Sequence, residues 1–199
     1  MLVAVTKTIS PEVAALLPQL GQFHLGESRP QELWRKAAAL PTTVRWHLVG
    51  HLQRNKLERT LPLVHLIHSV DSSRLLAALE DEAAKRQRGI DALVEVNVSG
   101  EVSKHGFAPE DLPLLTSMMA DLKYVRIRGL MTMAGFEENP ERTRPTFAAL
   151  RGLRERLQSQ LAGAHVLDHL SMGMSNDFEV AIEEGATLVR IGTALFGVI

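Results

Sequence analysis

Short runs of apolar and β-branched residues alternate with helix-like segments along the chain, and this alternation restricts the fold more than any other feature of the sequence. Apolar side chains recur at helical spacing most clearly over residues 72–87 and 145–161. Parallel strands joined by crossover helices form either a closed barrel or an open doubly wound sheet. Eight strand-like runs favour a closed (β/α)8 TIM barrel: LVAVTK, FHLGE, WHLVG, LIHSV, DALVEVNVS, RIRGLMTM, VLDHLS and ATLVRIG.

The length and the prolines agree with this interpretation. The chain has 199 residues, of which 45% are hydrophobic, and this suits one domain spanning residues 1–199. A proline is tolerated at the first position of a helix, because the N–H that it lacks has no partner there. Helices are therefore predicted to begin at Pro11, Pro30, Pro109 and Pro145.

Composition excludes several classes of function. Twenty-two basic and 23 acidic residues leave a net charge of −1, which gives no electrostatic reason to expect a nucleic acid or an anionic membrane as partner. The absence of cysteine excludes disulfides, thiolate metal sites and a cysteine nucleophile. With neither a signal-peptide pattern nor a long apolar stretch in the sequence, we expect a cytoplasmic protein, and we expect a monomer.

A lysine ends the first predicted strand. Ligands of such barrels bind where strands end and helices begin, so Lys7 is either a solvated strand end or an amine at the mouth of a site. A second candidate is LSMGMSNDFE, residues 170–179. There the seventh strand is predicted to end near Ser171, Gly173 permits a tight turn, and Ser175 or Asn176 caps a helix to about residue 184.

Glu179, three residues after Asn176, would complete a capping box. Free amides and hydroxyls in such a turn favour an anion, although an ordinary capped turn has the same pattern.

Arg190 alternates with its apolar neighbours on the eighth strand and is predicted to be covered. Its partner is then either a carboxylate such as Glu95 or an acceptor on a ligand. Gly192 and Thr193 add another amide and a hydroxyl, which favours phosphate.

The histidine spacing does not predict a metal site. His47 and His51 are four residues apart, but a strand running into a glycine turn does not align them. His65 and His68 are expected to face opposite sides of one strand. We therefore predict no metal site.

Several motifs together resemble the YggS/PROSC family, the pyridoxal phosphate homeostasis proteins. The resemblance implies an alanine-racemase-like barrel that carries pyridoxal 5′-phosphate as a Schiff base on the lysine of the AVTKT segment, Lys7. It also implies that Arg190 donates to the pyridine nitrogen and that the phosphate is held by Ser171, Ser175, Gly192 and Thr193, with Gly173 in the same turn. The motifs occur in this order: AVTKT, HLGESRPQE, WHLVGHLQRNK, IHSVDS, VNVSGEVSKHGF, RGLMTM, LSMGMSNDFEVAIEEGAT and VRIGTALFG.

The sequence departs from the family pattern in a few places. Ser28 replaces the asparagine of a GEN motif, Ile9 replaces a frequent second lysine, and Gly135 replaces a proline. The family also has a helix before the first strand, and this sequence lacks it. Lys56 and Lys104 are either secondary cofactor contacts or solvated side chains.

The resemblance implies a protein that stores, buffers or delivers pyridoxal phosphate, with no robust turnover of its own and with cofactor-requiring apo-enzymes as recipients. The alternative is an amino-acid racemase that uses the same cofactor. Racemisation needs a second acid or base, commonly a tyrosine, and Tyr124 is the only tyrosine here. A third class is a Schiff-base lyase without a cofactor, in which Lys7 attacks a carbonyl substrate.

Overall fold

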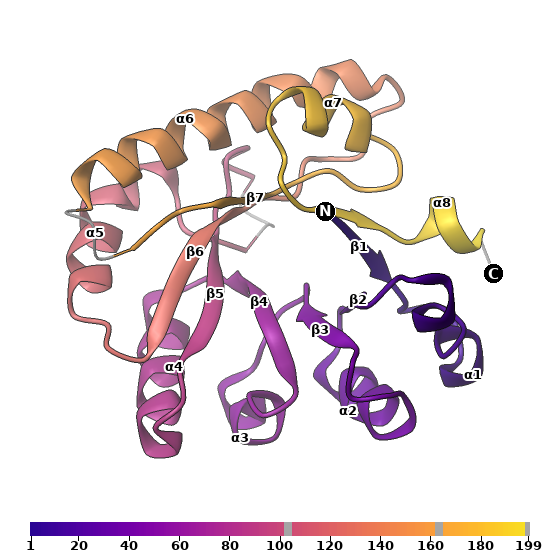
Figure 1. Ribbon diagram of the computed structural model, residues 1–199. Helices are drawn as coiled ribbons and strands as arrows, with labels where there is room; N and C mark the ends of the chain where they lie inside the picture. The colour runs from indigo at the N-terminus through magenta and orange to yellow at the C-terminus, as the bar shows by residue number, and fades with distance from the viewer. Residues whose placement is uncertain (102–104, 162–164, 198–199) are drawn as a thin grey trace.

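The computed structural model describes residues 1–101, 105–161 and 165–197. All eight predicted strands are present, and every pairing between them is parallel (Figure 1). The strands are β1 (Leu2–Val5), β2 (His24–Glu27), β3 (Arg45–Leu48), β4 (Val64–Val70), β5 (Ile90–Glu95), β6 (Val125–Met131), β7 (His169–Ser171) and β8 (Val189–Ile191).

The sheet closes into a barrel. Its strand order is β7-β6-β5-β4-β3-β2-β1-β8, so β1 pairs with both β2 and β8. A parallel bridge between Ser171 and Leu188 joins the two remaining edges, and the amide of Met172 donates to the carbonyl of Leu188 at 3.1 Å. These contacts confirm the closed barrel and exclude the open doubly wound sheet.

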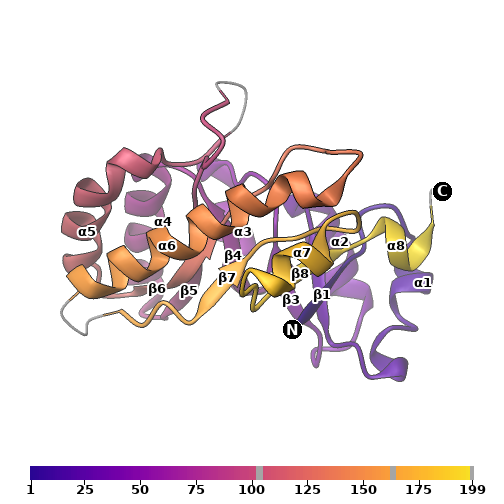
Figure 2. The ribbon, with the colours of Figure 1, turned by 90° about the horizontal axis from the view of Figure 1, so that it is seen from above.

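Helices follow the strands around the outside of the barrel (Figures 1 and 2). In both views α8 and α1 lie on the same side of the barrel, so the first and last helices of the chain are near each other. The α-helices are α1 (Pro11–Ala14), α2 (Pro30–Ala39), α3 (Leu57–Thr60), α4 (Ser73–Arg86), α5 (Leu112–Ala120), α6 (Arg144–Gln160), α7 (Phe178–Glu183) and α8 (Thr193–Phe196). Short 3-10 turns are η1 (Pro18–Leu20), η2 (Arg54–Lys56), η3 (Pro109–Asp111) and η4 (Pro140–Thr143).

The helices predicted over residues 72–87 and at Pro145 are confirmed within one residue at each end. The two helices predicted from apolar spacing are α4 and α6, and Ser72 caps α4 by accepting from the amide of Leu75. Pro11 and Pro30 begin α1 and α2, and Pro109 begins η3. Among the described residues, none of the helices has the length and apolar character that crossing a membrane requires.

The two faces of the sheet bury different side chains. The large core lies between strands and helices and includes Leu25, Ile67 and Leu130. Alternate residues of a strand point to opposite faces, so the neighbours of these residues point into the barrel. Five apolar residues form a separate small cluster there, namely Val3, Leu66, Leu93, Met131 and Leu188. The interior also holds a group of buried polar side chains, among them His47, His68, Ser171 and Arg190, and these lie beside the candidate site.

Candidate functional site

Lys7 lies at the rim of the barrel where the carboxyl ends of the strands meet. It is exposed and follows the end of β1 by two residues. Gly192 comes directly after β8, and a Cβ added to it would lie 3.1 Å from the carbonyl oxygen of Val5. The backbone after β8 therefore packs against the end of β1, close to the start of the segment that carries Lys7.

A buried polar cluster holds the residue before Lys7 in place. Lys36 of α2 donates through Nζ to Glu27 Oε1 at 2.6 Å and to the carbonyl oxygen of Thr6 at 2.5 Å. The Thr6 hydroxyl donates to the same Glu27 oxygen at 2.5 Å. The side chains of Lys36 and Glu27 are both 0% exposed. Because the hydroxyl and the carbonyl of Thr6 are both hydrogen-bonded, the backbone just before Lys7 has a fixed orientation.

The turn after β7 has a backbone that requires glycine. Gly173 has φ of +91°, and an added Cβ would lie 2.6 Å from the Cβ of Ala181. The amide of Arg190 donates to the Gly173 carbonyl at 3.0 Å, which ties the turn to β8. The carboxylate of Asp177 accepts from the amide of Met174 at 2.7 Å. Burial raises the pKa of this carboxyl.

Ser175 joins this turn to the segment after β8. Its hydroxyl accepts from the amide of Gly192 at 3.3 Å and from the amide of Ala194 at 3.1 Å. Thr193, the first residue of α8, is exposed between these two amides. Four of the predicted phosphate-turn residues, Gly173, Ser175, Gly192 and Thr193, therefore come together at the tips of β7 and β8.

The predicted cap of the following helix was wrong. The N-cap of α7 is Asp177 rather than Ser175 or Asn176, and no side chain makes a capping hydrogen bond there. Asn176 instead donates through Nδ2 to the carbonyl of Glu137 at 2.8 Å, so the capping box with Glu179 does not form. The longer loop before α7 leaves Ser175 free to reach β8.

Arg190 is buried inside the barrel, as predicted. Its Nη1 donates to the hydroxyl of Ser171 at 2.6 Å and its Nη2 to the carbonyl of Thr132 at 2.9 Å. Burial lowers the pKa of Arg190 to about 10, so the guanidinium stays protonated at neutral pH. Among the described residues, no carboxylate oxygen lies within salt-bridge distance of it. The partner suggested from the sequence, Glu95, acts on it only through the longer-range field.

Ser171 has a different environment from the other predicted phosphate contacts. It is fully buried, and its hydroxyl lies between Arg190 and Nδ1 of His68 at 2.8 Å. His68 Nε2 lies 2.9 Å from His47 Nδ1, and His47 Nε2 lies 2.9 Å from His24 Nδ1. A hydrogen-bonded chain thus runs through the barrel from Arg190 to the start of β2. Ser171 supports Arg190 here and belongs to this chain.

The prediction that His65 and His68 face opposite ways was wrong, because both rings approach His47. Their ring centroids lie 5.6 Å and 5.1 Å from that of His47. The pairing of β3 with β4 shifts register between Trp46 and His47, which gives β4 an extra residue at His65. Strict alternation along β4 therefore fails at this position.

The rim beside Arg190 carries further ionisable groups. Burial raises the pKa of Glu95 to about 7, and the charge of Asp71 acts in the same direction, whereas Arg190 and His51 oppose it. Glu95 is therefore poised to exchange a proton near neutral pH.

Lys56 ends η2 and its carbonyl accepts from Thr60 Oγ1 at 2.7 Å, while Lys104 lies outside the described residues.

A family model described as the alanine racemase N-terminal domain matches residues 1–199. The pyridoxal phosphate homeostasis protein of Aquifex aeolicus is 47% identical over 197 residues, which cover 98% of this chain and 86% of that protein. The protein of the same name from Pseudomonas aeruginosa is 41% identical, with 98% and 83% covered.

Solved structures give the same picture of the fold. PipY of Synechococcus elongatus PCC7942, determined with PLP bound, has a TM-score of 0.90 and 36% identity, covering 99% of this chain and 92% of PipY. An alanine racemase from Clostridium difficile 630 has a TM-score of 0.80 at 18% identity and is matched over 52% of its length. At that identity the racemase shares the fold alone.

Proposed function

Because this chain belongs to the family of pyridoxal phosphate homeostasis proteins, we propose that it binds pyridoxal 5′-phosphate and stores, buffers or delivers it. We propose Lys7 as the amine that holds the cofactor covalently. When bound, the cofactor supplies an aldehyde that condenses with amines and a pyridine ring that withdraws electrons.

One observation supports the proposal: Lys7, the Gly173–Ser175 turn and the Gly192–Thr193 segment follow the neighbouring strands β1, β7 and β8, and Arg190 is buried within β8. The Gly173–Ser175 turn and the Gly192–Thr193 segment bring hydroxyls and backbone amides together, a set of donors suited to a phosphate that would replace Ser175 Oγ as acceptor of the Gly192 and Ala194 amides. Arg190 is protonated, and its side-chain hydrogen bonds within the described part of the chain all go to uncharged groups, so its charge remains available to a ligand. Lys7 follows the strand that packs against the Gly192 segment.

The proposed role of Arg190 argues for holding the cofactor rather than for turnover. A guanidinium can only donate, so it pairs with an unprotonated pyridine nitrogen. An unprotonated ring withdraws electrons weakly, and this slows chemistry at an amino-acid α-carbon. Ser171 and the carbonyl of Thr132 hold the guanidinium in place for this contact.

The racemase alternative lacks a second acid or base of the usual kind at this rim. The single tyrosine, Tyr124, directly precedes β6, so it lies at the amino end of the barrel strands. Its distance along the strand from the carboxyl rim removes it as an opposing acid to Lys7. The lyase alternative needs Lys7 to act without a cofactor, and it leaves the β7–β8 turns and Arg190 without a role.

We also propose that the protein acts as a monomer in the cytoplasm and passes the cofactor to apo-enzymes that require it. A chain without cysteine suits a reducing compartment. Sedimentation at micromolar concentration should give the mass of a single chain, and a species of twice that mass would contradict the monomer.

Visible absorption of the purified protein mixed with pyridoxal phosphate tests the proposal. We expect the full chain to acquire the band of lysine-bound cofactor and Lys7→Ala to lose it. Lys56→Ala is the matched control and should keep the band, because Lys56 lies after β3 rather than after β1. A parent protein that stays colourless, or a band that survives in Lys7→Ala, would refute the proposal.

A further inference from the structure

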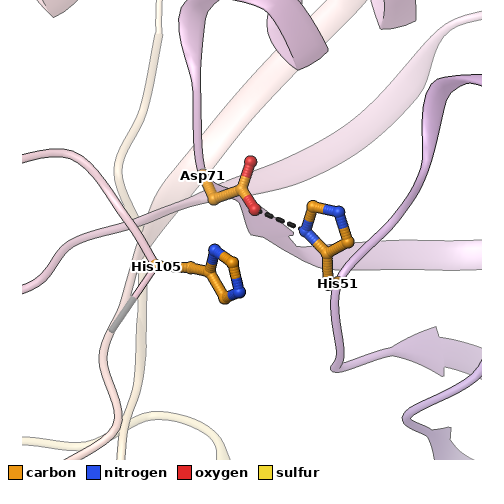
Figure 3. A group of neighbouring side chains, drawn as sticks. All are labelled: His51, Asp71 and His105. Carbon is orange, nitrogen blue, oxygen red and sulfur yellow. Dashed lines mark hydrogen bonds and ion pairs between the residues drawn. The ribbon is translucent and has the colours of Figure 1, made fainter. Parts of the chain in front are cut away.

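Two histidines and an aspartate meet at the rim of the barrel, on the side formed by β3, β4 and β5. His51 lies in the segment after β3, Asp71 follows β4 directly, and His105 lies in the segment after β5. Figure 3 shows the three side chains pointing toward one another. Their potential ligand atoms all lie within 4.8 Å of one another. This group takes no part in the proposed attachment of pyridoxal phosphate.

The backbone around His51 is held firmly. An added Cβ at Gly50 would lie 2.3 Å from the carbonyl oxygen of Ser28, so the turn before His51 depends on glycine. Ser69 of β4 donates through Oγ to the Gly50 carbonyl at 2.7 Å. The end of β3 is thereby tied to the strand that carries Asp71.

The backbone around His105 is tied to the end of β5. The amide of Phe107 donates to the carbonyl of Glu95, and the amide of Asn97 donates to the carbonyl of Phe107, both at 2.9 Å. Gly106, next to His105, has φ of +116° and a Cβ there would lie 2.8 Å from the Asn97 nitrogen. The backbone beside His51 is thus tied to β4 and the backbone beside His105 to the end of β5, and three neighbouring segments each provide one possible ligand.

The side chains are already close to a coordinating arrangement. His51 Nδ1 lies 2.7 Å from Asp71 Oδ2, and the rings of His51 and His105 stack with centroids 5.1 Å apart. Nitrogen and oxygen ligands lie about 2.0–2.2 Å from Zn²⁺, so two ligands of one tetrahedral ion are about 3.3–3.6 Å apart. Side-chain rotations at the accessible rim that change these separations by up to about 1.5 Å would bring all three atoms onto one ion.

We propose that His51, Asp71 and His105 form a binding site for a divalent transition-metal ion of the Zn²⁺ or Co²⁺ class. Two imidazoles and one carboxylate suit such ions, and they leave positions open for water or a small ligand. The Asp71 side chain is only 6% exposed and offers its charge from a sheltered position, whereas His51 is 48% exposed and accessible. Glu95 adds a second acidic group beside the site.

The sequence prediction of no metal site considered only histidines close together in the chain. The three residues are 20 and 34 positions apart, and only the parallel order of β3, β4 and β5 places their loops side by side. Spacing along a single element therefore contained no signal for them.

Co²⁺ titration of the full chain freed of pyridoxal phosphate tests the site, read from the visible absorption of bound Co²⁺ and from its displacement by Zn²⁺. We expect one Co²⁺ per chain. His105→Ala and Asp71→Asn should each weaken binding by roughly ten- to hundredfold or more, as losses in a metal site do. Circular dichroism of both variants confirms that they are folded.

His65→Ala is the matched control, because His65 is an exposed histidine at the opposite end of β4, where its ring lies 5.9 Å from that of His24. It should bind Co²⁺ like the parent. A parent without the Co²⁺ spectrum, full binding by both rim variants, or loss of binding in His65→Ala would overturn the proposal. Cofactor loading is read separately, by the visible band of the Lys7-bound group, so failure of one proposal leaves the other standing.

Discussion

At the scale of single residues, the position of Lys7 depends on side chains that contact its neighbour rather than itself. Lys36 and Glu27 are fully buried and meet at Thr6, one residue before Lys7. Within the described residues, Glu27 Oε2 accepts no hydrogen bond, so the cluster is not fully satisfied. The stability of a buried carboxylate with one unpaired oxygen depends strongly on its single cationic partner, here Lys36.

Lys36→Met should therefore lower the free energy of unfolding by about 3–5 kcal/mol, because it leaves the Glu27 charge buried without a partner. Urea denaturation measures the change. The double variant Lys36→Met/Glu27→Leu should recover part of the loss, since it removes both charges.

Arg126→Met is the control for the loss of an ion pair on the surface. Arg126 pairs with Asp91 at 2.6 Å, but its side chain is 62% exposed, so its removal should cost less than about 1 kcal/mol. Equal losses in Lys36→Met and Arg126→Met would show that the buried cluster does not stabilise the end of β1.

At the scale of elements, the turn between β7 and α7 combines backbone strain with close packing. Gly173 has a positive φ and no room for a Cβ beside Ala181. Gly173→Ala should lower the free energy of unfolding by about 2–5 kcal/mol, the sum of the left-handed backbone cost and of overpacking. The same variant should weaken binding of pyridoxal phosphate, because the turn carries Ser175.

Gly21→Ala separates these two causes. Gly21 has φ of +83°, but a Cβ there would meet no atom within 4 Å. Its replacement should cost only about 1–2 kcal/mol in urea denaturation and leave cofactor binding unchanged. If both variants lost the same stability, the packing of Gly173 against α7 would have no energetic weight.

The hydrogen-bonded chain from Arg190 to His24 links residues of five strands, and Arg190 sets the direction in which its hydrogen bonds run. Because Arg190 donates to Ser171, the serine hydroxyl can donate to Nδ1 of His68, whose Nε2–H then donates to His47. In the same direction, Nε2–H of His47 donates to Nδ1 of His24. Nitrogen chemical shifts should show the proton of His47 and His68 on Nε2, and an Nδ1 proton on either ring would contradict this polarity.

Burial lowers the pKa of His47 and of His68 well below 6.5. Below pH 6.5 the unfolded chain therefore binds protons that the folded chain excludes, and stability falls as the pH falls. His68→Gln removes one of these sites. Its unfolding free energy should decrease less steeply below pH 6.5 than that of the parent, by about 1.4 kcal/mol per pH unit.

Leu66→Val on the same strand controls for the lower stability of a core variant. This substitution removes no ionisable group, so it should lower the unfolding free energy by the same amount at every pH. Urea denaturation from about pH 5 to 7 measures this change. Parallel curves for the parent and for His68→Gln would mean that His68 is not held neutral.

At the scale of the whole molecule, the sequence predicts the barrel because each of its repeats carries its own signal. The alternation of apolar runs and helical segments, and the prolines at helix starts, depend only on nearby residues. The end of a strand and its buried face are also set by nearby residues. The sequence could therefore place Lys7 just after its strand and Arg190 on the covered face of its strand.

The interior of the barrel could not be predicted in the same way. His24, His47, His68 and Ser171 meet because the closed barrel places β2, β3, β4 and β7 around one interior, and the register of β4 against β3 shifts at His65. A hydrogen bond across the sheet, such as that from Arg190 to Ser171, also leaves no mark in the spacing of either strand. Such contacts follow from closure of the barrel rather than from any one element.

We propose that one cofactor bridges the end of β1 and the tips of β7 and β8, with Lys7 as its covalent anchor. Borohydride reduction of the full chain loaded with pyridoxal phosphate, followed by peptide mass mapping, identifies the lysine that holds it. We expect a single phosphopyridoxyl adduct on Lys7. An adduct on Lys56, Lys104 or any other residue in place of Lys7 would contradict it.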